Sequence, residues 1–496
     1  MTLTVSVKSE VSMQEELVGT ASEQEADALA GLGVVAAAAA IRDGNISSES
    51  YTAALLQRAR AHSDLNAFVT IDEAAALAAA RDADKARAVG STAPLLGVPL
   101  AVKDSYLTKG LRTTLGVKTL EGFVPDKDAD VVSAVKDAGG IVFGKNNLVE
   151  LSYGLTGNNS PYGQAKNPHN RDHVTGGSSS GAGASVAARI VPAALGGDTV
   201  GSIRVPASLC GVVGFKPTTG RWSRNGVAPI SHALDTTGVL ARNVEDCALI
   251  DQIVTKAEET EPSGRSDLKG VRFAYAPRQY LDLVDAEIEA NFKDAVQRLR
   301  EAGAEVVEVD LGENFSSFAE TSTWNIFFHD TMEALSDFLR RNNVPAAFDD
   351  IYNGLKPDLK ETWAHLVLPS GAGFISADTY KVSLSDHSEI QRRFSETFSR
   401  SGAEALLFPT TPSTAPSIEH QYKFLIGDQE VSYSALAKNT IPASAAGLPA
   451  ISIPTGLSSS GLPIGLEIDA ARGRDRRLLE LARRVEATVG ALTSPI

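Results

Sequence analysis

Apolar-rich runs alternate with segments of helical periodicity along most of the chain. One such run at 271–275 is followed by a segment in which Ile288, Phe292, Val296 and Leu299 recur three or four positions apart. Alternation of this kind predicts the α/β fold class, in which helices cover both faces of a sheet. Apolar-rich runs that predict buried strands lie at residues 95–102, 141–144, 190–195, 271–275, 306–311, 405–408, 450–454 and 464–468.

The pattern near the N-terminus predicts helices instead. Residues 1–25 are polar and acidic, and we expect a loose arm there, followed by one main domain at residues 26–496. The helices are predicted over residues 26–42, from a cap at Ser47 or Ser48 onward, over 71–87 and over 130–138.

Aromatic side chains are concentrated in residues 313–400. This segment holds 13 of the 30 Phe, Trp and Tyr residues of the chain, including Trp324, Phe338 and Trp363. Local core packing would explain the enrichment, and so would the lining of a pocket for an apolar or aromatic substrate. The two explanations are compatible, and we interpret 313–400 as a variable substrate-pocket segment within the domain.

Composition and charge exclude several functional classes. Of the 496 residues, 43% are hydrophobic, and the net charge of −15 argues against binding to nucleic acid or to an anionic membrane surface. The chain has neither a secretory signal pattern at its start nor an apolar run of about 18 residues, so a cytoplasmic location is expected. Cys210 and Cys247 lie in apolar surroundings, which favours buried free thiols. The histidines show no metal-binding spacing, and neither a metal nor a cofactor is expected.

Two clusters of glycine and serine, at residues 176–181 and 197–202, flank an almost wholly apolar segment at 182–195. Flexible linkers are polar throughout, so we interpret the clusters as a buried site in which bare backbone amides face a ligand. A serine beside such amides can attack a carbonyl carbon while the amides hold the oxygen. Residues 177–181 also fit the Gly-x-Ser-x-Gly nucleophile elbow, but the polar residues before them do not predict the buried strand that this elbow requires.

A serine nucleophile needs a base, and Lys103 is the candidate. It follows the apolar run at 95–102, and burial at the end of a strand lowers the pKa of a lysine because it disfavours the ammonium form. A lysine at such a position is more often a solvated edge residue, so the motifs around it decide the interpretation.

Several of these motifs resemble the amidase signature family, whose members use a Ser–Ser–Lys triad. Residues 97–104 (Gly-Val-Pro-Leu-Ala-Val-Lys-Asp) are similar to its lysine motif, and residues 176–179 with 202–206 are similar to the signature itself. Ser178 and Ser202 lie 24 positions apart, a spacing that fits the family. Further similar blocks at 144–150, 447–450 and 461–466 extend the resemblance from about residue 30 to 485.

The resemblance implies a fold and a set of roles. The fold is one large α/β/α domain on a mixed, twisted sheet. Ser202 would be the nucleophile, Ser178 the proton relay, and Lys103 the base that later returns the proton to the leaving amine. Tyr153 falls where the family lines the acyl pocket, and Ser179 is a substrate-binding candidate expected to support the site. The oxyanion hole would consist of the backbone amides of Thr199, Val200, Gly201 and Ser202.

Three positions depart from the family pattern. Val200 stands where the family usually has glycine, and because valine resists positive φ, the oxyanion turn must keep a conformation open to a β-branched residue. Ser105 and Glu467 stand where Asn and Gln are frequent, and neither is expected to touch the triad.

The implied activity is amide hydrolysis through a serine acyl-enzyme. Residues 203–207 and 209–215 look most similar to those of bacterial indoleacetamide and mandelamide hydrolases, which implies a primary aryl-acetamide or a similar aromatic amide as the small-molecule substrate. The products would be an acid and ammonia. An aryl acylamidase that cleaves anilides or esters, a glutaminase subunit of a tRNA-dependent amidotransferase and an inactive binding protein are the alternatives. A homodimer is kept as a hypothesis.

Overall fold

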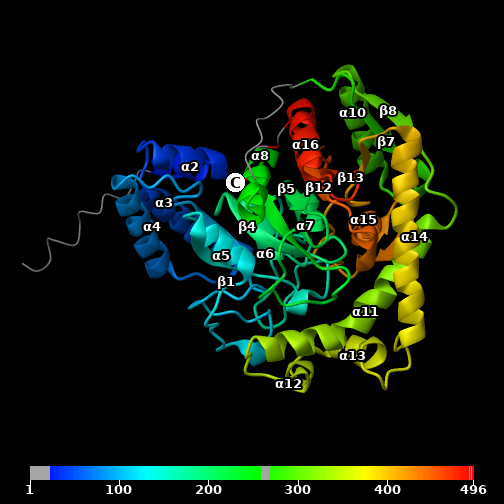
Figure 1. The fold of residues 1–496 in the computed structure, drawn as a ribbon, viewed down its shortest axis with the longest axis horizontal. Coiled ribbons are helices and arrows are strands. Elements are labelled where there is room, and N and C mark those ends of the chain that lie inside the picture. Colours follow the sequence, from blue (N-terminus) through cyan, green and yellow to red (C-terminus); the bar gives the residue numbers. More distant parts are fainter. Residues whose placement is uncertain (1–22, 258–266, 491, 493) are drawn as a thin grey trace, which may run out of the picture.

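The computed structural model describes residues 23–257, 267–490, 492 and 494–496, and it is built around one large mixed sheet (Figure 1). In spatial order its strands are β1 (Phe68–Thr70), β3 (Ile141–Asn146), β2 (Pro99–Lys103), β4 (Ala193–Asp198), β6 (Thr236–Ala241), β5 (Val213–Lys216), β12 (Ala450–Leu457), β13 (Pro463–Ala470), β9 (Ala405–Pro409), β7 (Arg272–Tyr275) and β8 (Glu305–Glu308). Parallel pairs occur in both halves of the sheet, and antiparallel pairs join the halves. A small separate hairpin consists of β10 (Lys423–Ile426) and β11 (Gln429–Ser432).

Helices pack on both faces of this sheet. One layer holds α5 (Asp130–Asp137), α8 (Val244–Thr255), α10 (Ala286–Glu301) and α16 (Asp475–Val489), and the opposite layer holds α6 (Ser180–Ala187), α7 (Arg204–Cys210) and α15 (Ile441–Ala446). The remaining helices are α1 (Glu23–Ala30), α2 (Val34–Arg42), α3 (Ser48–Ala61), α4 (Glu73–Ala88), α9 (Pro277–Tyr280), α11 (Phe315–Arg341), α12 (Phe348–Asn353), α13 (Pro357–Leu366) and α14 (Ala377–Ser401). The expected α/β/α fold with a mixed sheet is confirmed.

The helix predicted over residues 26–42 is two helices, α1 and α2, which meet at an angle of 112°. Gly33 lies at the break, where a Cβ would come within 2.4 Å of the Asp246 carboxylate. Asp246 Oδ1 accepts a hydrogen bond from the Val35 N–H at 2.9 Å, so it caps α2 from across the fold. A long-range contact therefore ends the first helix where the local alanine pattern does not.

Most of the expected arm at residues 1–25 lies outside the described residues, and α1 already begins at Glu23. Each predicted strand has a counterpart, although β2 and β4 begin later than expected. The predictions missed the strands β1, β5 and β6. Cys210 and Cys247 are buried free thiols, as expected. Within the described ranges, no single helix is long and apolar enough to cross a membrane, whereas the bent pair Gln24–Ala30 and Val34–Arg42 would be by length and composition alone.

The first Gly/Ser cluster leads into α6, a helix of small residues in which every side chain is buried. At Gly181, a Cβ would lie 2.1 Å from the Ala67 carbonyl oxygen and 2.6 Å from the Asn147 nitrogen. Because no side chain fits there, glycine lets the helix pack directly against neighbouring backbone. This close packing fixes the turn before α6, which carries Ser178.

The aromatic segment forms α11 to α14, and the two long helices α11 and α14 pack against each other along one side of the molecule (Figure 1). Many of its rings belong to buried clusters, as Phe315 and Phe394 do with ring centroids 5.4 Å apart. Core packing therefore explains part of the enrichment.

Candidate active site

Lys103 is the last residue of β2, a strand in which all five residues are buried. Because β2 lies between β3 and β4, the lysine ends inside the protein, with 1% of its surface exposed. Its Nζ donates a hydrogen bond to Ser178 Oγ at 2.8 Å. Burial lowers the pKa of Lys103 to about 7, although Asp198 and Asp235 act to raise it. An amine with this pKa is partly neutral near pH 7 and can accept a proton.

Ser178 and Ser179 are buried in the turn before α6. The carbonyl oxygen of Ser178 accepts from the Val149 N–H at 3.1 Å, and the Ser179 N–H donates to the Ser202 carbonyl oxygen at 3.2 Å. Ser179 Oγ donates to the Gly197 carbonyl oxygen and accepts from the Gly197 N–H, each at 3.2 Å. These bonds join the turn to the end of β4, so the structure brings the two Gly/Ser clusters together.

The chain turns at residues 199–203, between β4 and α7. Gly201 has a φ of +142°, and a Cβ there would lie 2.2 Å from Thr440 Oγ1, so glycine is required. Val200 keeps a negative φ, and its carbonyl oxygen accepts from Thr440 Oγ1 at 2.6 Å. The turn therefore has the conformation that a β-branched residue demands.

The backbone N–H groups of this turn face no protein acceptor. Across the part of the chain that the structure describes, the amides of Thr199, Val200, Gly201 and Ser202 donate no hydrogen bond. Four successive free amides beside a buried serine can hold a developing oxyanion.

A buried ion network fixes both ends of the turn. Arg204 Nε and Nη2 donate to the two carboxylate oxygens of Asp198 at 3.0 Å each, and Nη1 donates to Glu467 Oε1 at 2.8 Å. Asp198 Oδ2 also accepts from the Ile203 N–H at 3.1 Å. Burial alone would lower the pKa of the Arg204 guanidinium, but Asp198 and Glu467 raise it above its ordinary value. The residues between Asp198 and Ile203 are thus held in one conformation.

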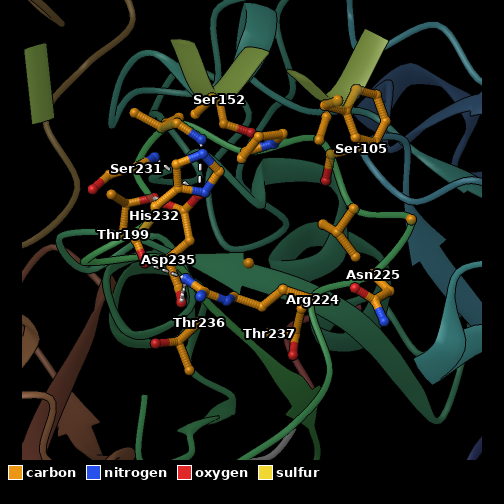
Figure 2. A pocket seen from close by; sticks show the side chains of 18 of the residues that line it. Ser105, Ser152, Thr199, Arg224, Asn225, Ser231, His232, Asp235, Thr236 and Thr237 are labelled. Atoms are coloured by element: carbon orange, nitrogen blue, oxygen red, sulfur yellow. Dashed lines mark hydrogen bonds between the residues drawn. The ribbon is translucent and has the colours of Figure 1, made fainter. Parts of the chain in front are cut away.

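The loop before β6 packs against the other side of the turn. Thr199 Oγ1 donates to Asp235 Oδ1 at 2.8 Å, and Asp235 Oδ2 accepts from the N–H groups of Ile230 and Ser231 at 2.8 and 3.0 Å. Arg224 Nη1 donates to the Asp235 carbonyl oxygen at 3.3 Å. Figure 2 shows Thr199, Asp235 and Arg224 near one another on the cavity wall. Burial raises the pKa of Asp235, while its hydrogen bond from Thr199 acts to lower it.

Two adjoining cavities lie beside Lys103. The larger has a volume of about 330 Å³, and its wall includes Lys103, Thr199, Arg224, His232, Asp235 and Phe338. The smaller is narrow, with a volume of about 10 Å³, and is lined mainly by apolar residues, among them Leu115, Leu151, Tyr153, Leu335 and Trp363. The wall between the cavities is made of Ser105, Ser152, Ala228 and Pro229, which line both.

The two residues predicted to bind substrate lie in different places. Tyr153 lines the narrow cavity, its hydroxyl hydrogen-bonded to Thr331 Oγ1 and its ring 5.2 Å from that of Trp363. Ser179 lines neither cavity and bonds only to backbone. In the aromatic segment, Phe338 and Trp363 line cavities, so the substrate-pocket interpretation also holds in part.

Sequence reasoning missed Asp235, Arg224 and Thr440. The stretch 229–238 combines Pro, Ser, Asp, Thr and Gly, a composition that predicts only a loop. Ser105 was not expected to touch the triad, and it lines both cavities without a hydrogen bond to the triad residues. Among the described residues, no group of three or more His, Cys, Asp and Glu side chains could hold a metal ion.

Comparison with known proteins places this geometry in context. The family model described as Amidase matches residues 50–479. The chain is 35% identical to the mandelamide hydrolase of Pseudomonas putida, over 92% of each chain. It is 34% identical to the indoleacetamide hydrolase of Pseudomonas savastanoi, over 91% of this chain and 95% of that one. Its identity to a glutamyl-tRNA(Gln) amidotransferase subunit of Desulforapulum autotrophicum is 36%, over 91% and 96%. Among solved structures, the native peptide amidase from Stenotrophomonas maltophilia superposes with a TM-score of 0.79 at 29% identity, over 94% and 98% of the two chains.

Proposed function

The chain belongs to the amidase family, and from that premise we propose that it hydrolyses primary aromatic amides through an acyl-enzyme on Ser202. As a member of the family it is a hydrolase that acts on amide C–N bonds. The observation that carries the proposal is the buried hydrogen bond from Lys103 Nζ to Ser178 Oγ, together with the pKa of about 7 that burial imposes on the amine.

In the first half-reaction, Ser202 Oγ attacks the amide carbon of the substrate. Its proton passes to Ser178 Oγ, and the proton of Ser178 passes to the neutral Lys103 Nζ. The carbonyl oxygen becomes an oxyanion bound by the free amides of residues 199–202, where one such donor typically lowers the barrier by about 3 kcal/mol. When the C–N bond breaks, the proton on Lys103 returns through Ser178 to the nitrogen, which leaves as ammonia.

In the second half-reaction, water replaces the amine. Lys103 again takes a proton through Ser178, this time from the attacking water, and the same amides bind the second oxyanion. Collapse of that intermediate returns the proton to Ser202 Oγ and releases the carboxylic acid. Both half-reactions therefore use one neutral amine and one relay hydroxyl, with no net change in the enzyme.

Two observations support an aromatic acyl group. Two of the relatives are named for mandelamide and indoleacetamide, both amides of aryl-substituted acetic acids. The narrow apolar cavity beside Lys103 has the rings of Tyr153 and Trp363 in its wall. A benzene ring occupies a cavity of roughly 150 Å³, so the ring would lie along the wall shared by the two cavities, with its edge toward the narrow one.

The second candidate function is that of a glutaminase component in an amidotransferase. It is favoured by the 36% identity to a subunit of such an enzyme, a value that matches the identity to the two amide hydrolases. The two functions differ in substrate and in dependence on partners, because a stand-alone amidase needs no second protein for turnover.

The test is an ammonia-release assay on the purified chain with phenylacetamide, indoleacetamide, acetamide and glutamine. We expect both aryl amides to exceed acetamide and glutamine in kcat/KM by roughly tenfold or more, since each buried apolar group contributes about 1–3 kcal/mol to discrimination. The Ser202→Ala variant is the control and should release no ammonia above background. A preference for glutamine would overturn the aromatic assignment and favour the second candidate.

A further inference from the structure

Two leucines in the wall of the narrow cavity have left-handed backbone conformations. Leu115 has a φ of +54° and Leu151 a φ of +49°. Such values are strained for branched residues and are retained when the surrounding structure imposes them. Each leucine is followed by a second residue with positive φ, Gly116 at +75° and Ser152 at +66°. Two distorted segments, distant in sequence, therefore meet at one cavity.

Hydrogen bonds clamp these segments to each other. The Leu151 N–H donates to the Leu115 carbonyl oxygen at 3.1 Å. Asn159 Nδ2 bridges them by donating to the carbonyl oxygens of Gly116 and Leu148, at 3.0 and 2.9 Å. A Cβ on Gly116 would lie 2.6 Å from Asn159 Nδ2, so the bridge also depends on glycine. The left-handed conformations are thus fixed from several directions.

The same segments are bonded to the chain that carries the reacting groups. The Leu115 N–H donates at 3.2 Å to the carbonyl oxygen of Asp104, the residue after Lys103. The Val149 N–H, two residues before Leu151, donates at 3.1 Å to the carbonyl oxygen of Ser178. The cavity wall is therefore placed relative to Lys103 and Ser178 by direct backbone contacts.

We propose that Leu115 and Leu151 determine the largest acyl group that the site accepts. Both side chains line the narrow cavity and are nearly buried, at 1% and 8% exposure, and they reduce it to about 10 Å³. The strained backbone keeps them pointing into the space where an acyl group would lie. Removing either side chain lengthens the cavity without touching the groups that move protons. The inference rests on the proposed function, in that it assigns this cavity to the acyl group.

The experiment compares the Leu115→Gly and Leu151→Gly variants with the unaltered chain, using two acyl series. One series runs from acetamide to hexanamide, and the other from phenylacetamide to 2-naphthylacetamide. Glycine relieves the positive φ and removes the side chain. We expect the kcat/KM ratio of the largest to the smallest member of each series to rise by roughly tenfold, mainly through a lower KM for the largest amide. Leu115→Ala and Leu151→Ala serve if a glycine variant does not fold.

Leu120→Ala is the matched control. Leu120 is 1% exposed, lies in the same apolar cluster and lines neither cavity, so its loss should lower the melting temperature and leave the ratio unchanged. An unchanged ratio in folded variants at both positions would overturn the inference, as would an equal change in Leu120→Ala. The aliphatic series keeps this result separate from the proposed function, since a chain that hydrolyses no aryl amide can still show or lack the size effect.

Discussion

Three lysines among the described residues are buried, and the side-chain contacts of each explain why only one can act as a base. Lys145 Nζ donates to three oxygens, among them the hydroxyls of Thr108 and Thr113, and lies 3.4 Å from Asp104. Lys216 Nζ donates to a backbone carbonyl oxygen at 3.0 Å. Burial lowers the pKa of each to about 8. Of the three, Lys103 alone contacts a serine hydroxyl in the turn beside Ser202, and burial lowers its pKa furthest.

The pH dependence of turnover follows from this pKa. Lys103 must be neutral to accept a proton, so kcat should fall about tenfold for each pH unit below about 7 and level off above it. Replacing Asp235 by Asn removes a charge that raises the lysine pKa, and the acid limb should move to lower pH. The measurement is a kcat–pH profile from about pH 5 to about pH 9. An acid limb that stays in place, or moves to higher pH, in the Asp235→Asn variant would contradict this role of Lys103.

Lys103→Ala should lower kcat by roughly 10²–10⁴-fold, the usual contribution of a positioned base, and should abolish the acid limb. The matched control is Lys360→Ala, which removes a lysine from α13 that lines neither cavity. If the acid limb persists in Lys103→Ala with residual activity, another group is the base.

At the level of elements, the apolar runs that end at Lys103 and near Asp198 are predictable because a buried strand needs a continuous apolar sequence. The strand β6 was missed because Thr236, Thr237 and Gly238 carry no such signal, and only its neighbours in the sheet bury it. The serine spacing and the roles came from resemblance to a family. The network that holds the turn could not be predicted, since Arg204 and Glu467 lie 263 positions apart.

Loss of Arg204 should show what this network contributes. In Arg204→Met, two buried carboxylates lose their partner, and the free energy of unfolding should fall by about 3–5 kcal/mol. Turnover should fall as well, because Asp198 no longer joins both ends of the turn. Glu467→Gln is the control, since the amide oxygen still accepts from Arg204, and its cost should stay below about 1.5 kcal/mol. Urea denaturation measures both, and equal stability of the two variants would be inconsistent with the network.

At the scale of the whole molecule, the aromatic segment contributes to the site through α11. Asp330 on this helix accepts a hydrogen bond from Ser231 Oγ at 2.5 Å, which ties the helix to the loop that carries Asp235. The end of α11 also supplies Phe338 to the larger cavity. The enrichment of aromatic residues was visible in the sequence, but composition does not reveal which ring reaches a cavity. Resemblance could supply the triad, whereas the polar chamber depends on contacts between distant segments.

Cutting this link should weaken substrate binding. In Asp330→Ala the loop at residues 229–235 loses its tie to α11, and kcat/KM should fall roughly tenfold, mainly through a higher KM. Glu320→Ala changes an exposed acid on the same helix and should leave both constants unaltered. Steady-state kinetics with phenylacetamide decide the matter, and a fall confined to kcat would argue against a role in binding.

The central claim is that Ser202 carries the acyl group. The most direct measurement is mass spectrometry of peptides from enzyme quenched during turnover of an activated phenylacetyl ester. The account predicts a phenylacetyl adduct on the peptide that contains Ser202, lost when hydroxylamine is added and absent from Ser202→Ala. An adduct on a different residue, or full amide hydrolysis by Ser202→Ala, would contradict it.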